Sequence, residues 1–363
     1  MASIDKRGGR YIVRWRVGGG SRQKTFTSYK AATEHKAQIE SEAAAGKAVD
    51  PVNSRTAFGA WYPVFEGGKL NVKAQTLATS RSLYDNHIEP RWGEVMLDHI
   101  TQPDVQRWVA NLNGKGLAAG TVRAVYAEFN AAMRAAQSAR FIRESPCVGI
   151  NLPTIHRDEV TVLDHDEIER LADAINRRYR ALIVFLAYSG LRIGEAAALT
   201  WNDVDLEKRT VTVRYTVTEL TGQGLSLSVP KTPAARRIVP LPRHVIDTLK
   251  QHRNAYPSRW VFTTTNGSQV NPRAFNRRSF HTALATAKLD CHVHDLRHTA
   301  ISLWIRAGVD LPRVKAWAGH STVTVTLNTY AKFFPTDDDG ILKMLDTRIT
   351  KAQKKAKKAK AKS

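Results

Sequence analysis

The sequence predicts a multidomain protein of the α+β class. Its 363 residues exceed one ordinary domain, and 42% of them are apolar, which is enough for two or three buried cores. Two stretches that contain proline, residues 50–54 and 145–153, interrupt the pattern as linkers do. We therefore expect a small β-hairpin and helix domain over residues 1–50, a helical domain over residues 54–145, and a mixed α+β domain over residues 160–349.

The N-terminal segment alternates apolar and basic side chains. Residues 10–17 read RYIVRWRV, three glycines follow, and residues 22–27 return to an extended pattern, which predicts a β-hairpin before a helix over residues 29–44. Basic side chains with Trp15 or Tyr11 nearby suit a β-ribbon that enters a DNA groove. The candidate DNA-binding residues are Arg14, Trp15, Arg16 and Arg22. The alternative is a basic hairpin that packs on the protein's own core domain.

The second and third regions differ in pattern. Residues 56–141 have helical periodicity, with Thr101 as the cap of one helix and another helix start near Thr121. The third region mixes both element types around a small sheet. We expect helices over residues 164–174, 178–188 and 191–199, strands over residues 210–218, 225–229 and 237–240, and further helices after residue 242.

The chain is strongly basic, with a formal net charge of +22 and an isoelectric point near 10.1. A protein with this charge usually binds a polyanion, nucleic acid first, with an anionic membrane surface as the alternative. Seven of the charges are lysines of residues 351–363, so the rest of the chain keeps +15. The lysine-rich tail, residues 350–363, cannot build a core and is expected to be disordered.

Other features of the composition favour the cytoplasm. Cys147 and Cys291 are far apart in the sequence and form no disulfide framework, which fits a reducing compartment. The N-terminus has no apolar stretch like that of a signal peptide. The longest apolar run, residues 181–188, is too short to span a bilayer.

Two segments of the third region place a cation where it could meet a phosphate. In SGLRIGEAAAL, Arg192 and Glu195 have the i, i+3 spacing that puts both on one helix face, so the acid can orient the guanidinium. In VPKTPAARRIVPL, Lys231 lies in a turn between two strands. Each segment alone is more simply a surface ion pair or a solvated lysine.

Three further segments are more specific. In HDLRHT, His294 and Arg297 are spaced to reach one anion from a helix. In AGHST, His320 follows a glycine at an expected helix start, where amide donors and the helix dipole favour phosphate. Tyr330 follows ten residues later in TLNTYAK; without these neighbours it would read as a core tyrosine with a wet hydroxyl.

A zinc site is a competing interpretation of one cluster. Cys291, His292, His294 and His298 lie close together, but their spacing fits no common zinc pattern. We expect His294 to serve phosphate, His298 to lie in or near the helix interior, and Cys291 to be a small buried thiol. We predict no metal and no cofactor, and the absence of a P-loop motif makes nucleotide hydrolysis unexpected.

The five segments together, in this order, resemble the tyrosine recombinase (phage integrase) family. LRIGEAAALTWNDVD resembles the first arginine box of the family, and HDLRHTAISLWIRAG with VKAWAGHSTVTVTLNTYAK resembles its second box. The first two regions resemble an arm-type DNA-binding domain and a helical core-binding domain. Two positions depart from the family pattern: Lys332, where many members have histidine, and Ala318, where leucine is common.

The resemblance implies a mechanism that the residue types also suit. Tyr330 would attack the scissile phosphate and form a 3′-phosphotyrosyl link with a free 5′-hydroxyl. Arg192 and Arg297 would clamp the non-bridging oxygens. Lys231 would protonate the leaving oxygen, and His294 would assist proton transfer at the tyrosine. His320 would hydrogen-bond the phosphate, and Glu195 would support the arginine.

The resemblance also implies partners. They are double-stranded DNA with core and arm attachment sites and a homotetramer on that DNA, with a directionality factor and a host DNA-bending protein as further candidates. The protein would act on the nucleoid in a bacterial cytoplasm. A regulator that keeps the fold without catalysis and a type IB topoisomerase are the alternatives. The complete catalytic set argues against the first, and the N-terminal hairpin domain argues against the second.

A last segment concerns assembly. Residues 337–339 are three aspartates that suit a helix N-terminus, and an apolar stripe follows, formed by Ile341, Met344, Leu345 and Ile349. Packing of this stripe on its own domain and on a neighbouring subunit both remain open. Family members pass this segment to a neighbour, so the resemblance favours the second arrangement.

Overall fold

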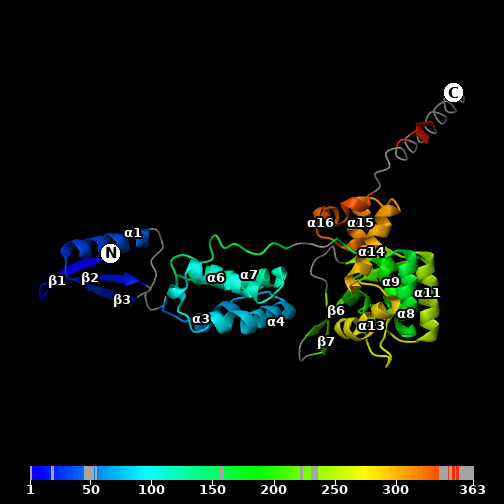
Figure 1. Ribbon diagram of the computed structural model, residues 1–363, viewed down its shortest axis with the longest axis horizontal. Helices are drawn as coiled ribbons and strands as arrows, with labels where there is room; N and C mark the ends of the chain where they lie inside the picture. Colours follow the sequence, from blue (N-terminus) through cyan, green and yellow to red (C-terminus); the bar gives the residue numbers. More distant parts are fainter. Residues whose placement is uncertain are drawn as a thin grey trace. The chain divides into compact units, whose positions relative to one another are not determined.

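The structure is a computed structural model. It describes residues 2–17, 20–44, 53, 55–155, 159–220, 224–229 and 236–334, with residues 342, 346, 347, 349 and 350. The chain divides into two compact units, Met1–Arg157 and Asp158–Ser363. Lys231, the tail from residue 351, and the stripe residues Ile341, Met344 and Leu345 lie outside the described residues. The expected multidomain α+β class is confirmed (Figure 1).

The first unit begins with a small antiparallel sheet covered by one helix (Figure 1). The sheet is formed by β1 (Ser3–Arg7), β2 (Arg10–Val17) and β3 (Gly20–Phe26), and α1 spans Tyr29–Ala44 as expected. Val13 and Ala32 are fully buried between sheet and helix. The prediction of a two-stranded hairpin missed β1, because SIDKR carries few strand-favouring residues and depends on pairing with β2.

The rest of the first unit is a helical bundle with an aromatic core. Phe58, Trp92, Trp108 and Phe129 are buried and pack ring against ring. The predicted cap is confirmed, since the Thr101 side chain accepts a hydrogen bond from the Asp104 amide. The principal helices are α3 (Phe58–Gly67), α4 (Ala74–Leu83), α6 (Gln102–Gly114) and α7 (Ala119–Ser138).

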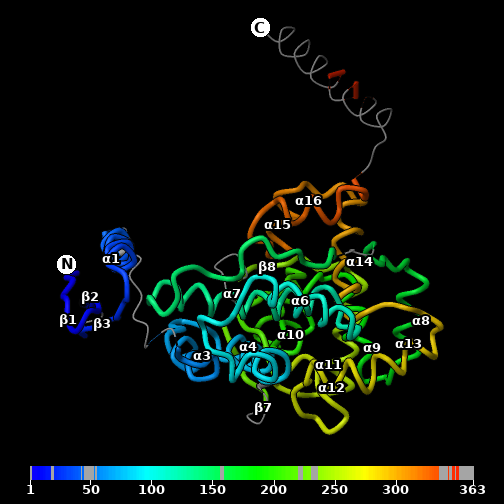
Figure 2. The backbone as a smooth tube through the Cα atoms, turned by 60° about the vertical axis from the view of Figure 1, so that its left-hand side comes forward, coloured from blue at the N-terminus to red at the C-terminus, as the bar shows by residue number. Residues whose placement is uncertain are grey.

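The second unit is built around α9 (Arg177–Ser189), which is buried on most of its surface. It packs against α8 (His165–Ala174), α11 (Arg243–Ala255) and α14 (Val293–Arg306). Figures 1 and 2 both place α15 (Leu311–Ala318) beside α16 (Val323–Tyr330), next to the end of α14. The ends of α9 and α15 meet α14 through Arg297, and most of the predicted catalytic residues lie in this part of the unit.

Two small sheets complete the second unit. One has the order β4-β5-β8, formed by Val204–Asp205, Thr210–Val213 and Arg237–Pro240, and the other pairs β6 (Thr216–Leu220) with β7 (Gly224–Ser228). The single strand expected over residues 210–218 was therefore wrong. Buried side chains keep to alternate positions along residues 210–218, since Val213 and Val217 are both buried. The hydrogen-bonded partner nevertheless changes, because β5 pairs with β8 whereas β6 pairs with β7.

A second boundary also differs from expectation. The helix expected over residues 191–199 is only one turn, α10 (Ile193–Ala196). Alanines suggested a longer helix, but the chain beyond α10 turns to pair with another segment. The Val261 amide donates to the Leu199 carbonyl at 2.9 Å, and Thr200 bridges to Trp260. Tertiary pairing thus overrides the helix propensity.

Candidate active site

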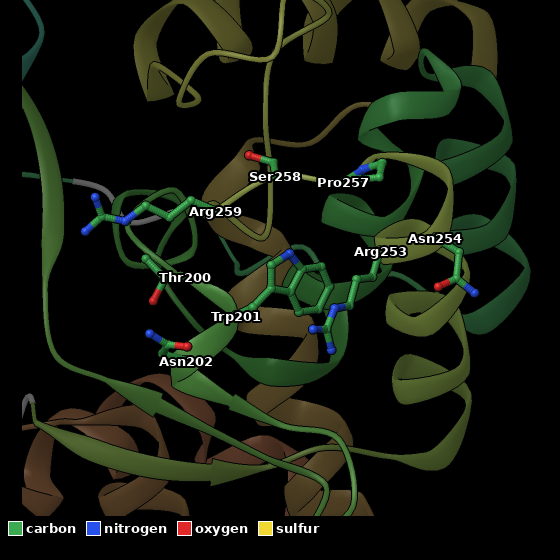
Figure 3. A pocket seen from close by; sticks show the side chains of 8 residues that line it. All are labelled: Thr200, Trp201, Asn202, Arg253, Asn254, Pro257, Ser258 and Arg259. Atoms are coloured by element: carbon green, nitrogen blue, oxygen red, sulfur yellow. The ribbon is translucent and has the colours of Figure 1, made fainter.

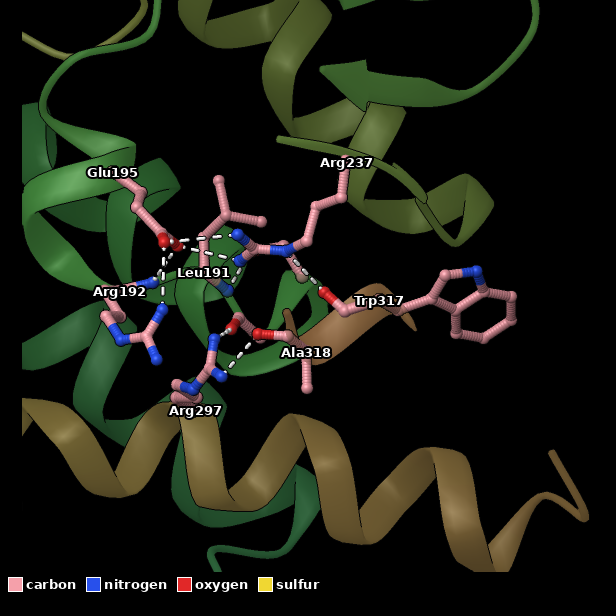
Figure 4. A network of polar contacts seen from close by, with 9 residues as sticks. Leu191, Arg192, Glu195, Arg237, Arg297, Trp317 and Ala318 are labelled. Atoms are coloured by element: carbon pink, nitrogen blue, oxygen red, sulfur yellow. Dashed lines mark hydrogen bonds and ion pairs between the residues drawn. The ribbon is translucent and has the colours of Figure 1, made fainter. Parts of the chain in front are cut away.

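The first predicted pair is present where α9 ends. Gly190 adopts a left-handed backbone conformation (φ 62°) that turns the chain, and Arg192 then caps α10. The Arg192 amide and guanidinium both donate to the Glu195 carboxylate, at 2.9 and 3.0 Å. The Arg192 side chain is 45% exposed, whereas that of Glu195 is buried. The expected orientation of the arginine by the acid is confirmed (Figure 4).

Arg297 is buried on α14 and holds two other segments. Its guanidinium donates to the carbonyls of Gly190 and Ala318, each at 2.5 Å (Figure 4). These carbonyls lie at the ends of α9 and α15, so one cation ties three helices together. Burial and the positive charge of Arg192 lower the pKa of Arg297 to about 9. The guanidinium is therefore still charged at neutral pH.

Sequence reasoning missed a third arginine. Arg237, on β8, donates to both Glu195 oxygens at 3.1 and 2.8 Å and to the Trp317 carbonyl at 2.6 Å (Figure 4). Burial alone would raise the pKa of Glu195, but the hydrogen bonds and charge of Arg237, with Arg192, lower it to about 2. The signal available in the sequence was a basic residue inside the expected strand RIVP.

Tyr330 ends α16 and is almost fully buried. Its hydroxyl lies 2.6 Å from Nδ1 of His298. Burial raises the pKa of Tyr330 to about 12, although the charge of Arg297 opposes this. His298 was expected in or near the helix interior, and the proton role at the tyrosine was assigned to His294; the structure instead brings His298 to the hydroxyl. The available signal was the i, i+4 spacing of the two histidines.

His294 and His320 surround the same region. The His294 ring lies 5.0 Å from that of His298, and the His320 ring stacks near Tyr330 at 6.4 Å. Burial, followed by neighbouring positive groups, lowers the pKa of each of these two histidines to about 4. Both rings are therefore neutral at neutral pH in the free protein, and a bound anion would raise their pKa values.

The position of His320 differs from the expected helix start. Gly319 is the left-handed cap of α15 (φ 67°), and the His320 amide donates back to the Lys315 carbonyl at 3.1 Å. The first turn of α16 begins only at Val323, so the backbone of His320 is not a free anion donor. Its ring is held instead, with Nδ1 2.8 Å from the Thr326 hydroxyl. When that hydroxyl donates to Nδ1, the proton of the neutral ring lies on Nε2.

The candidate DNA-binding residues of the first sheet fall on two faces. Trp15 contacts His35 of α1, with ring centroids 5.5 Å apart, and Arg22 is the cross-strand partner of Trp15, so both lie on the helix side. Arg14 and Arg16 lie on the opposite, open side, where Arg14 also pairs with Asp5 at 2.8 Å. The structure brings together only part of the predicted set.

The described residues show no arrangement that matches the zinc interpretation. Among the residues that the structure describes, no group of three or more His, Cys, Asp or Glu side chains is placed to hold a metal ion. Cys291 is buried as expected, and burial raises the pKa of its thiol to about 12. His292 is largely exposed and pairs with Asp295.

A separate pocket of about 580 Å³ lies elsewhere in the second unit (Figure 3). The Arg253 guanidinium lies over the Trp201 ring there, 5.2 Å from its centroid. The lining contains none of the predicted catalytic residues: Thr200, Trp201, Asn202, Arg253, Asn254, Pro257, Ser258 and Arg259. This pocket is therefore not the candidate active site.

Comparison with known proteins identifies the class. Residues 161–336 match the phage integrase family, and residues 58–113 match the N-terminal SAM-like domain of phage integrases. The prophage phiRv2 integrase of Mycobacterium tuberculosis is 30% identical over 264 residues, which cover 70% of this chain and 69% of that protein. The protein is a tyrosine recombinase, an enzyme that cleaves and rejoins DNA. It belongs to the phage integrase family.

Solved structures agree on the fold. The Tn1549 transposon integrase in complex with circular intermediate DNA has a TM-score of 0.70 at 23% identity, covering 80% of this chain and all of that one. A lambda integrase tetramer bound to a Holliday junction has a TM-score of 0.60 at 16% identity, covering 92% of this chain and 94% of that one. Within the described parts of this chain, none of the helices combines the length and apolar character of a membrane span.

Proposed function

We propose that the protein is the integrase of a phage or another mobile element and that Tyr330 is its nucleophile. The observation that carries this proposal is the grouping of cationic and imidazole side chains near the buried Tyr330 hydroxyl: the charges of Arg192 and Arg297 act on it, the His320 ring lies beside Tyr330, and His294 adjoins His298, which contacts the hydroxyl. These residues come from four separate segments of the second unit. The relationship to a prophage integrase supports the biological role.

The proposed reaction is an in-line transfer of a phosphodiester. The Tyr330 oxygen attacks phosphorus, the bond to the 5′-oxygen breaks, and a 3′-phosphotyrosyl ester forms. Arg192 and Arg297 neutralise the charge that develops on the non-bridging oxygens; one such donor is typically worth about 3–4 kcal/mol of the barrier. Lys231 protonates the leaving oxygen. The ester conserves the energy of the broken bond, so rejoining needs no ATP.

The neutral histidines and the acid have supporting roles. His294 lies near both arginines and donates to the phosphate, and His320 donates through Nε2 while Thr326 holds its other nitrogen. Glu195 orients Arg192 through the two hydrogen bonds that it accepts. No step in this scheme requires a metal ion or a cofactor.

We further propose how the domains divide the work on DNA. Residues 1–50 bind arm-type sites through the open sheet face with Arg14 and Arg16, residues 54–145 bind the core site, and residues 160–349 catalyse. The tail, residues 350–363, adds affinity without sequence preference. Four copies act together, as the lambda integrase tetramer on a Holliday junction suggests. A directionality factor and a host DNA-bending protein are further partners, and the site of action is the nucleoid in the bacterial cytoplasm.

The proposal also covers the C-terminal segment, residues 337–349. Of the apolar stripe, only Ile349 lies within the described residues, where it is exposed. We propose that the segment packs on a neighbouring copy, and packing on its own domain is the alternative. A chain that ends at Thr336 should bind core DNA but fail to form the tetramer; loss of the cooperative melt of the catalytic domain would favour the alternative.

The nucleophile is tested with the full chain on a nicked suicide substrate that carries a candidate attachment core. Tyr330→Phe should keep DNA affinity and form no covalent adduct, because only the hydroxyl is lost. Tyr215→Phe is the matched control, since Tyr215 is an exposed tyrosine of the same unit and should not affect cleavage. An adduct with Tyr330→Phe would assign another nucleophile. Plasmid relaxation without strand exchange would favour the topoisomerase alternative.

A further inference from the structure

The contact between His298 and Tyr330 is not explained by the catalytic set proposed above. His298 lies on α14 one turn after His294, and its Nδ1 is 2.6 Å from the tyrosine hydroxyl. This is the direct hydrogen-bond distance that a general base requires. The His294 ring contacts the His298 ring and lies near Arg192 and Arg297, so it faces the anion side of the site.

We propose that His298 is the proton acceptor for the nucleophile in this enzyme. The inference rests on the proposed function, because it assumes that Tyr330 attacks the phosphate. In the cleavage step the Tyr330 proton passes to Nδ1 of His298, the oxygen forms its bond to phosphorus, and the phosphorus bond to the 5′-oxygen breaks. Lys231 supplies the proton that the leaving oxygen takes up. In rejoining, His298 returns its proton to the tyrosine.

The surroundings of His298 suit this exchange. The charged and titratable groups that face it are His294, Asp295 and Arg297 on its own helix, Tyr330 on α16, and His320 in the loop between α15 and α16. Burial lowers the pKa of His298, so the ring is neutral and able to accept a proton at neutral pH. Asp295 acts in the opposite direction and favours the imidazolium once it forms.

The tyrosine needs such an acceptor. Burial raises its pKa to about 12, so the fraction ionised at neutral pH is very small. Arg297 favours the phenolate, but its guanidinium donates to the carbonyls of Gly190 and Ala318 and not to the phenol oxygen. His298 is therefore the described side chain that can remove this proton directly.

The first test compares two variants of His298 in single-turnover cleavage by the full chain. His298→Gln can still hydrogen-bond the tyrosine but cannot accept its proton, whereas His298→Ala does neither. We expect both to cleave about a hundredfold to ten-thousandfold more slowly than the unaltered chain. A glutamine variant that cleaves at the native rate would reduce His298 to a positioning residue and overturn the proposal.

The second test separates the two proton transfers. A substrate with sulfur in place of the 5′-bridging oxygen has a leaving group that needs no protonation. It should rescue Lys231→Ala and leave His298→Gln slow, because the defect of the latter is at the nucleophile. Rescue of His298→Gln to the same extent would place its role at the leaving group and contradict the assignment.

The third test keeps His298 and so does not depend on the folding of a His298 variant. Replacement of Tyr330 by 3-fluorotyrosine lowers the pKa of the phenol. If His298 accepts the proton, cleavage is lost as the pH falls through the pKa of the imidazole, and fluorination leaves that midpoint in place. A midpoint that moves with the phenol would refute the proposal. If the unaltered chain forms no covalent adduct at all, the proposed function fails instead.

Discussion

Arg192, Arg237, Arg297 and Glu195 form an ion network in the second unit. Replacement of Arg237 by methionine tests how strongly this ion network stabilises the unit. Methionine keeps much of the apolar stem of the side chain and removes the cation. The side chains of Arg237 and Glu195 are each only 4% exposed. The substitution would leave the Glu195 carboxylate buried, and among the described residues the Arg192 guanidinium would be the cation that still pairs with it.

The magnitude follows from the pKa of Glu195. Its ordinary value of 4.5 falls to about 2 in the folded protein. A lowering of this size corresponds to roughly 3 kcal/mol, and removal of one partner from a buried pair typically costs about 3–5 kcal/mol. Because Arg192 still holds part of the charge, we expect Arg237→Met to lower the free energy of unfolding by about 3 kcal/mol at pH 7.

The pH dependence has a defined sign. The folded pKa of Glu195 lies below its unfolded value, so the contribution to stability is fully present above pH 4.5 and is lost as the pH falls toward 2. The deficit of Arg237→Met should therefore be largest at neutral pH and shrink in acid. Urea unfolding of the full chain, monitored by hydrogen exchange of the amides in α9 and α14, measures the stability of the second unit separately.

Two controls make the argument refutable. Arg236→Met removes the exposed neighbouring cation and should change stability by at most about 0.5 kcal/mol. Glu195→Gln combined with Arg237→Met removes the stranded charge and should recover part of the loss. If Arg237→Met is as stable as the Arg236 control, or if the double variant recovers nothing, the buried charge is not the origin of the effect.

Three further outcomes are expected. Gly190→Ala should lower the free energy of unfolding by about 2–4 kcal/mol in urea titrations, because its φ is positive and a Cβ would lie 2.6 Å from the Trp304 ring; native stability would contradict this. Strand cleavage should persist in excess EDTA, because guanidinium groups neutralise the phosphate in the proposed reaction; complete loss restored by magnesium or zinc would contradict it. Deletion of residues 351–363 should flatten the slope of log K against log salt, by about 0.9 for each phosphate that the tail neutralises, without changing which sites are cut; an unchanged slope would show that the tail does not bind DNA.

The catalytic cluster was partly predictable because its local geometry is periodic. The i, i+3 spacing of Arg192 and Glu195 predicts that the acid can orient the guanidinium, and the two side chains are hydrogen-bonded. Arg237 could not be found in this way, because its partners Glu195 and the Trp317 carbonyl are distant in sequence and meet only in the tertiary fold. The same reason applies to His298: the spacing placed it near His294, but only the docking of α16 brings the Tyr330 hydroxyl to it.

The helices and strands likewise divide into those that the sequence predicts and those that it does not. Long helices such as α1 and α9 lie where the sequence predicts them. Errors arose where pairing with another segment decides the structure: β1 has little pattern of its own, the run over residues 210–218 changes partner, and the chain after Ala196 leaves the helix so that Thr200 pairs with Trp260. These are pairings between separate segments, which the propensity of one segment does not contain.

In the proposed reaction, the charges of the ion network would match the transition state better than the free substrate. Three guanidinium groups, of Arg192, Arg237 and Arg297, and the Glu195 carboxylate give this network a net charge of +2 (Figure 4). A phosphodiester carries one negative charge, whereas attack by the deprotonated tyrosine produces a phosphorane with two. The buried Arg237 fixes Glu195, which fixes the more exposed Arg192, so the donors are oriented before the charge develops. In the proposed reaction the network would therefore be neutralised at the transition state, and such differential binding accelerates a reaction.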